Sequence, residues 1–215
     1  EEAIRFKENN SDVQVTAVTL GPKARVNNAL LTAMAMGADD SILINTEASL
    51  DALTTAKALS EAIKKEGDYH LIFSGKLAID GNVSAVPLML SEILDIPHAS
   101  VASQVEYGDG TVTATREIEG GTKESFKLKC PAMITANKGL NKPRFASLPG
   151  IMKAKKKPIT ELSLEDLGLG EDQVKVKFTN YALPPEREAC KMIEGDPANQ
   201  VEELVKLLQE EAKVL

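Results

Sequence analysis

The hydrophobic positions along the chain switch between two spacings, and this pattern predicts the secondary structure. Residues 13–20 (VQVTAVTL) are rich in β-branched side chains and stop at Gly21-Pro22, which predicts a buried strand followed by a loop. Within residues 24–36, apolar side chains recur at helical spacing, and Gly37 follows as a stop signal. The first elements are therefore a strand, a loop and a helix.

The same unit recurs farther along the chain. Residues 41–44 and 69–74 have the apolar character of buried strands, whereas residues 49–66 and roughly 83–94 have helical spacing. Strands that alternate with helices of this length predict a mostly parallel sheet with helices on both faces. We therefore expect a Rossmann-like α/β fold.

The pattern changes in the middle of the chain. Residues 101–107 and 111–116 predict a β-hairpin whose turn contains Asp109-Gly110, and a further strand pair is expected at residues 125–129 and 132–136. These strands predict an antiparallel extension of the α/β fold.

The C-terminal part has a different character. Residues 137–158 show little periodicity and contain a lysine-rich run, which indicates an exposed, extended arm. Residues 199–215 place their apolar side chains on one stripe of an amphipathic helix. We therefore divide the chain into an α/β domain, residues 1–136, and an extended arm with a C-terminal helix, residues 137–215.

Composition and charge narrow the range of functions. A chain of 215 residues that is 43% hydrophobic can bury one sizeable core, and its net charge of −7 argues against nucleic acid as a partner. The two cysteines and two histidines lack the spacing of a metal site, so we expect no bound metal. The apolar runs are far shorter than the roughly 20 residues of a spanning helix, so we expect no membrane insertion.

The segment with the most chemical information is residues 74–86, which joins a predicted strand to a predicted helix. Ligands of parallel sheets bind at this end of the strands. Gly75 lets the backbone approach a ligand closely, and the amides of Val83–Val86, with the Ser84 hydroxyl, would face a phosphate. An ordinary loop explains the same spacing, because the segment is neither a dinucleotide fingerprint nor a Walker motif. No nucleophile and base occur at a recognisable spacing, so we expect no catalytic residue.

Four motifs along the chain resemble those of a known protein family. Residues 75–80 (GKLAID) are similar to the family run G-K-Q-A-I-D, and residues 35–39 (AMGAD) are identical to another family motif. Residues 129–136 (KCPAMITA) resemble a signature that ends in L-P-A-V-x-T-A, and residues 141–157 resemble N-x-P-R-Y-A-T-L-P-x-I-M-K-A-K-K-K. The motifs occur over nearly the whole chain in the order found in electron transfer flavoprotein beta subunits, which this sequence resembles.

The resemblance implies a fold of the adenine nucleotide alpha hydrolase-like type and a heterodimer. The alpha subunit of that heterodimer holds the redox-active FAD, which part of this chain would shield. The family also carries a nucleotide in the beta subunit itself, either AMP or, in the electron-bifurcating branch, a second FAD. The matching positions here are Leu20, Gly21, Gly75, Lys76, Ala78, Ile79, Asp80, Gly81, Asn82, Val83, Ser84, Ala85 and Val86.

Two departures from the family pattern concern that nucleotide. Family members usually begin with a strand and loop carrying V-K-x-V-x-D and later N-P, which are absent here, so we expect the N-terminal strand of the domain to be missing from this sequence. Residues 81–86 keep the glycine and the valine of the bifurcating pattern I-D-G-D-T-A-Q-V but not its Asp, Thr or Gln. The choice between AMP and FAD is therefore open.

The arm resembles the family's recognition loop, in which one leucine enters an apolar pocket of a partner dehydrogenase. That leucine corresponds to Leu148, and the docking segment comprises Arg144, Ser147, Leu148, Pro149, Ile151, Met152 and Lys153. Lysines 153 and 155–157 would attract an acidic partner, although a solvated surface explains them as well.

The resemblance implies an electron carrier subunit rather than an enzyme. It would pass electrons between acyl-CoA dehydrogenase-like partners and another redox acceptor or donor, with bifurcation left open. We expect it in the cytoplasm of a bacterium or in the mitochondrial matrix of a eukaryote. The alternative is a stand-alone adenine-nucleotide-binding sensor module of the same superfamily, which would have no need of the arm.

Overall fold

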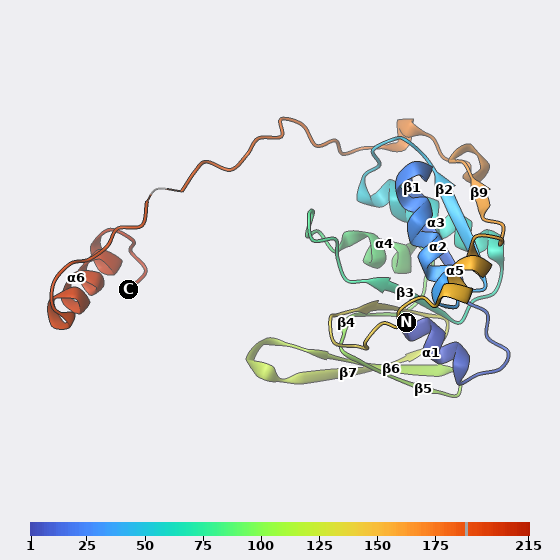
Figure 1. Cartoon of the computed structure of the whole chain (residues 1–215), viewed down its shortest axis with the longest axis horizontal. Coiled ribbons are helices and arrows are strands. Elements are labelled where there is room, and N and C mark those ends of the chain that lie inside the picture. Colours follow the sequence, from blue (N-terminus) through green and yellow to red (C-terminus); the bar gives the residue numbers. More distant parts are fainter. Residues whose placement is uncertain (188) are drawn as a thin grey trace. The chain divides into compact units, whose positions relative to one another are not determined.

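The computed structural model describes residues 1–187 and 189–215, which form two compact units, residues 1–177 and residues 178–215 (Figure 1). The second unit contains helix α6 (Pro197–Glu210), which Asp196 caps by accepting hydrogen bonds from the amides of Ala198 and Asn199. Among the described residues, no helix is long and apolar enough to span a bilayer.

The first unit contains the remaining helices and strands. In chain order they are α1 (Glu2–Glu8), β1 (Thr16–Gly21), α2 (Lys23–Met36), β2 (Asp40–Asn45), α3 (Ala52–Glu66), β3 (Leu71–Gly75), α4 (Ala85–Ile93), β4 (His98–Ala102), β5 (Gln104–Gly108), β6 (Thr111–Glu117), β7 (Lys123–Lys129), β8 (Ala132–Ala136), α5 (Leu148–Ala154) and β9 (Thr160–Leu162), with short 3-10 turns at Glu119–Gly121, Glu165–Leu167 and Glu171–Gln173.

The parallel strands form two three-stranded sheets. Strand β2 lies between β1 and β9, and strand β8 lies between β3 and β4. The middle strands are the most apolar, because a strand that is paired on both sides and covered on both faces has no exposed side. Ile42, Leu43 and Ile44 of β2 and Met133 and Ile134 of β8 are almost completely buried. The predicted α/β fold is confirmed, with two parallel sheets where one was expected.

The third sheet is antiparallel, in the order β5-β6-β7, and confirms the predicted extension. The expected pairing of residues 125–129 with 132–136 is wrong. Strand β7 alternates exposed and half-buried residues and pairs with β6, whereas β8 is buried along most of its length and enters a parallel sheet. The expected strand 101–107 is divided at Ser103, because β4 and β5 belong to different sheets.

A cavity of about 1330 Å³ lies between the outer edges of β1 and β3. Residues 13–16 and Val18 line it from the β1 side, and residues 69–74 line it from the β3 side. Within the described residues, β1 pairs only with β2, and β3 pairs only with β8. The two parallel sheets therefore face each other across this cavity with unpaired edges.

The first part of the predicted arm packs on the α/β unit. Residues 137–177 belong to the first compact unit, helix α5 lies against α2, and strand β9 pairs in parallel with β2 (Figure 1). Within this chain the contacts divide after Lys177. The division at residue 137 into a nucleotide-binding domain and a partner-wrapping arm stays a prediction about binding.

Asp51 fastens the end of the first unit to helix α3. Its carboxylate accepts hydrogen bonds from the amides of Thr54 (2.8 Å), Lys175 (2.7 Å) and Val176 (3.0 Å). These amides, that of Thr54 foremost, hold the pKa of Asp51 below its ordinary value. The carboxylate thus caps α3 and fixes residues 175 and 176 before the chain passes to the second unit.

We expect Asp51→Asn to lower the free energy of unfolding by about 1 kcal/mol, because the neutral amide has one acceptor oxygen where the carboxylate uses two, and it accepts weaker hydrogen bonds than the charged group. In the wild type the contribution of Asp51 is complete above the unfolded-state pKa, about 3.9, and is lost as the pH falls through the lower folded-state pKa. Urea unfolding of both proteins between pH 7 and pH 2 measures this. A stability difference that persists unchanged to pH 2 would contradict the role of the charge, and Asp68→Asn, at an exposed position, is the matched control.

Candidate functional site

The end of strand β3 has an open backbone surface. Gly75 is the last residue of β3 and pairs with Ala136 of β8. A Cβ atom built on Gly75 would have no heavy atom within 4 Å, apart from its chain neighbours. A flat or bulky ligand can therefore approach this backbone closely, as the sequence predicts for Gly75.

A polar atom lies beside this open surface without a partner. The hydroxyl oxygen of Ser74 is buried, and among the described residues it has no hydrogen-bond partner. Buried polar atoms are nearly always hydrogen-bonded in folded proteins, so an unsatisfied one calls for a ligand or another explanation. Ser74 directly precedes Gly75 in β3 and also lines the cavity between β1 and β3.

The loop 76–84 between β3 and α4 is organised by its own hydrogen bonds. The amide of Asn82 donates to the carbonyl of Ala78 (2.8 Å), and the amide of Gly81 donates to the carboxylate of Asp80 (2.8 Å). The amide of Lys76 donates to the carbonyl of Ala136, which ties the start of the loop to β8. The loop extends beyond the start of α4 (Figure 1). It contains most of the predicted nucleotide-binding residues.

Helix α4 begins two residues later than expected. The N-cap is Ser84, whose φ of 56° is left-handed and cannot continue a right-handed helix in the N-terminal direction. Val83 and Ser84 therefore belong to the loop, while Ala85 and Val86 form the first turn of the helix. Only the last two of the four predicted amides lie in the helix terminus.

Leu20 and Gly21 lie at the end of β1, in the other parallel sheet. Gly21 has a φ of 143°, and a Cβ there would approach the Val26 side chain at 3.1 Å, so the position favours glycine. Among the described residues, no hydrogen bond joins this pair to residues 75–86. The structure therefore presents the predicted nucleotide residues as two groups at strand ends.

A polar cluster that the sequence did not reveal follows Gly21. Asn45 accepts a hydrogen bond from the Lys23 amide (3.1 Å) and donates one to Glu161 (2.8 Å), while the Lys23 ammonium also contacts Glu161. The hydrogen bond from Lys23 is the main cause that lowers the pKa of Glu161. The cluster joins the ends of β1, β2 and β9, and no sequence motif marks it because its members are far apart in the chain.

The predicted docking segment forms a short helix, α5, from Leu148 onward, and only the part before Ser147 is extended. Ser147 caps it by accepting a hydrogen bond from the Gly150 amide (3.1 Å), and Pro149 lies in the first turn. A serine followed closely by proline is a helix-start signal, so the sequence did contain the information for α5. Leu148, the first residue of α5, has 72% of its surface exposed, and Ile151 and Met152 are exposed beside it.

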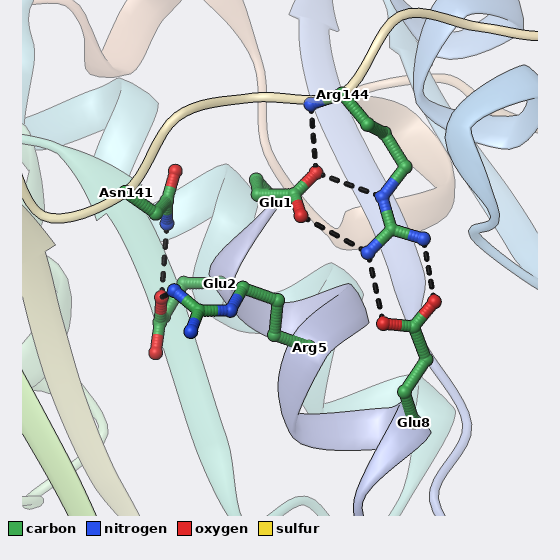
Figure 2. Close-up of polar contacts among 6 residues, drawn as sticks. All are labelled: Glu1, Glu2, Arg5, Glu8, Asn141 and Arg144. Atoms are coloured by element: carbon green, nitrogen blue, oxygen red, sulfur yellow. Dashed lines mark hydrogen bonds and ion pairs between the residues drawn. The ribbon is translucent and has the colours of Figure 1, made fainter.

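Two charged residues of the arm have partners within the chain. The Arg144 guanidinium forms ion pairs with Glu1 and Glu8, as Figure 2 shows. The Lys157 ammonium donates hydrogen bonds to the carbonyls of Ala38 (3.1 Å) and Asp39 (2.6 Å). Lys153, Lys155 and Lys156 are exposed. The charge available to a partner is therefore smaller than the lysine run suggests.

Within residues 1–187 and 189–215, the structure contains no group of three or more His, Cys, Asp or Glu side chains that could hold a metal ion.

Comparison with known proteins extends this picture. Residues 1–167 match a protein family described as Electron transfer flavoprotein domain. The chain is 43% identical over 220 residues to the electron transfer flavoprotein subunit beta of Bacillus subtilis (strain 168), an alignment that covers 100% of this chain and 84% of that protein.

Animal and plant proteins are also similar to this chain. The subunit beta of Mus musculus is 38% identical over 218 residues, covering 100% of this chain and 82% of that protein. The mitochondrial subunit beta of Arabidopsis thaliana is 37% identical over 217 residues, covering 100% of this chain and 83% of that protein. The similarity thus runs from one end of the chain to the other in bacterial, animal and plant proteins.

Proposed function

This chain belongs to the electron transfer flavoprotein beta subunits, and on that premise we propose that it forms a heterodimer with an alpha subunit and serves there as a scaffold for nucleotide binding and partner docking. As a member of this family it is an electron carrier subunit rather than an enzyme. The redox-active FAD would be held mainly by the alpha subunit, and a bound flavin supplies the electron storage. The residues of this chain would bind the nucleotide, orient the flavin and dock the redox partner.

The second part of the proposal is an adenine nucleotide bound at the end of β3. The buried, unsatisfied Ser74 hydroxyl supports it, together with the open backbone at Gly75. The first-turn amides of α4 at Ala85 and Val86 point out of the helix terminus, where they favour a phosphate. The remaining residues are those proposed from the resemblance: Leu20, Gly21, Lys76, Ala78, Ile79, Asp80, Gly81, Asn82, Val83 and Ser84.

AMP and FAD share the adenosine monophosphate group that such a site recognises. The residues around Gly75 and Ser84 therefore fit either nucleotide, and the type of electron transfer follows from which one is bound. One AMP would accompany simple electron carriage, and a second FAD would accompany bifurcation.

The third part of the proposal is docking of an acyl-CoA dehydrogenase-like partner through α5. Leu148 exposes an apolar side chain at the start of a helix that is fixed to the α/β unit, and fixed apolar anchors lose little entropy on binding. Ser147 and Pro149 hold its backbone. The exposed Lys153, with Lys155 and Lys156, would attract an acidic partner surface. Ile151 and Met152 extend the apolar contact.

The alternative, a stand-alone nucleotide sensor, gives no role to α5 and its exposed leucine. Where the protein acts is also part of the proposal: the bacterial cytoplasm, or the mitochondrial matrix in a eukaryote, in keeping with the name of the Arabidopsis thaliana relative.

Gly75→Ala tests the nucleotide site. Because a methyl group there meets no atom of the chain, we expect the free energy of unfolding of the nucleotide-free protein to change by less than about 0.5 kcal/mol. The same methyl group would occupy space that the nucleotide needs, and we expect about a tenfold weaker affinity for AMP or FAD. Isothermal titration of the heterodimer with AMP and with FAD measures the affinity. Unchanged affinity for both nucleotides would place the site elsewhere.

Leu148→Ala tests docking. Losing a leucine that becomes buried in the complex with the partner should raise the KM for the reduced dehydrogenase by about tenfold or more, while the bound nucleotide remains. Stopped-flow reduction of the heterodimer by an acyl-CoA dehydrogenase of the same organism gives the rates. Leu53→Ala, which truncates another exposed leucine on α3, is the matched control. Wild-type kinetics for Leu148→Ala would remove the docking role.

A further inference from the structure

The segment that leads into the docking helix is fastened by one side chain. Between Leu140 and Ser147 the described chain has neither helix nor strand. The Arg144 guanidinium donates to both carboxylate oxygens of Glu1, from Nε at 2.9 Å and from Nη2 at 3.0 Å. The backbone amide of Arg144 donates to the same carboxylate at 3.0 Å. Backbone and side chain of Arg144 are thus bound to one acceptor (Figure 2).

The other edge of the guanidinium faces a second carboxylate. Nη1 and Nη2 of Arg144 donate to Glu8, which lies seven positions after Glu1, about two helical turns along the same face. Paired N–H donors on paired oxygens make a charge-assisted contact with a fixed direction, which a lysine in the same place would not supply. Glu1 has only 8% of its side chain exposed, so water competes little for that contact.

The charges at this cluster are strongly stabilised. Hydrogen bonds from the Arg144 side chain, and then from its backbone amide, lower the pKa of Glu1 to about 2. Hydrogen bonds to Glu8 and Glu1 raise the pKa of Arg144 above its ordinary value. The cluster therefore stays fully ionised throughout the physiological pH range.

A second contact reinforces the first. The side-chain amide of Asn141 donates to Glu2 at 2.9 Å, and the Tyr107 hydroxyl donates to the other oxygen of Glu2 at 2.8 Å. Helix α1 thus holds the entering segment at Asn141 and at Arg144. We name these five residues the α1–arm clamp. It comprises the N-cap residue Glu1 and Glu2 and Glu8 of helix α1, together with Asn141 and Arg144 of the arm.

Helix α1 is a firm support for the clamp. Ile4 is buried and contacts Gly37, and Lys7 donates a hydrogen bond to Asp39 at 2.5 Å. The Phe6 and Tyr107 rings lie 4.4 Å apart. Because α1 is fixed to both the α2–β2 turn and strand β5, a segment clamped to it is fixed to the α/β unit.

Large apolar side chains follow the clamp directly. Phe145, next to Arg144, is 96% exposed, and Leu148 lies four positions after Arg144. A segment that presents exposed apolar side chains binds more tightly when its direction is set in advance, because less conformational entropy is lost on association.

We propose that Arg144 is a positioning residue for partner docking: it acts through Glu1 and Glu8 to orient residues 145–148, and it does not itself contact the dehydrogenase. This inference rests on the docking role proposed for Leu148. A positioning role, unlike a direct contact, predicts that substitution of Glu1 and Glu8 also weakens docking, although both residues lie outside the arm.

The test compares three variants of the full heterodimer: Arg144→Gln, the double variant Glu1→Gln/Glu8→Gln, and Arg5→Gln. The third variant is the matched control, because it also removes a positive charge, and Arg5, on the same helix, pairs with Glu2 at 3.8 Å and not with Glu1 or Glu8, the two partners of Arg144. The electron donor is an acyl-CoA dehydrogenase of the same organism, reduced with its acyl-CoA substrate.

We expect Arg144→Gln and the double glutamate variant each to raise the KM for the dehydrogenase about fivefold, with kcat nearly unchanged. A variant that combines Arg144→Gln with Glu1→Gln and Glu8→Gln should have no larger effect than Arg144→Gln alone, because the three substitutions break one interaction. Arg5→Gln should behave as the wild type. If Arg144→Gln raises the KM while the double glutamate variant leaves it unchanged, Arg144 contacts the partner directly and the proposal is wrong.

Hydrogen exchange gives a reading that does not depend on the partner. The amides of residues 145–147 should exchange faster in Arg144→Gln and in the double glutamate variant, and at the wild-type rate in Arg5→Gln. Unchanged exchange in both clamp variants would also overturn the proposal. If Leu148→Ala has wild-type kinetics while the clamp variants loosen the arm, the docking function itself fails and the clamp stands as structure only.

Discussion

The turn between helix α2 and strand β2 holds three other segments of the chain in place. The Ala35 carbonyl lies so near Gly150 that a Cβ on that glycine would approach it at 2.5 Å, so α5 can lie this close only with glycine at that position. The Ile4 side chain of α1 lies over Gly37, where an added Cβ atom would be 3.4 Å from it. The carbonyls of Ala38 and Asp39 accept hydrogen bonds from Lys157, which follows α5 in the chain. Residues 35–39, at the end of α2 and in the turn to β2, therefore contact α1, α5 and Lys157.

This arrangement explains how one small unit serves two binding tasks. The proposed nucleotide residues lie at strand ends and in the loop before α4, whereas the docking residues lie on α5, which packs on α2. Helix α5 and the segment before it are fixed at both ends, by the α1–arm clamp and by the contact with residues 35–39. A rigidly held leucine can then recognise a partner without the α/β unit changing shape.

The sequence predicted the elements whose signals are local. Strand β2, with Ile42–Ile44, and helix α3 have clear periodicity, and the α/β class with an antiparallel extension followed from their order. Pairing was predicted less well, because it depends on contacts between distant residues: Ala132 and Met133 read as a hairpin partner yet fill the middle of a parallel sheet. Helix α5 was missed although Ser147 and Pro149 marked its start. The Arg144–Glu1–Glu8 cluster leaves no sequence signal at all, since about 140 positions separate its members.

We propose above all that this chain is the nucleotide-carrying partner in a flavin heterodimer, and one measurement tests this directly. The chain would be produced together with its alpha subunit, the purified complex denatured, and the released FAD and AMP counted per heterodimer. We expect a stable complex that releases one FAD with one AMP, or two FAD if the complex bifurcates electrons. A chain that forms no stable complex, or a complex that releases one FAD and no second nucleotide, would contradict this proposal.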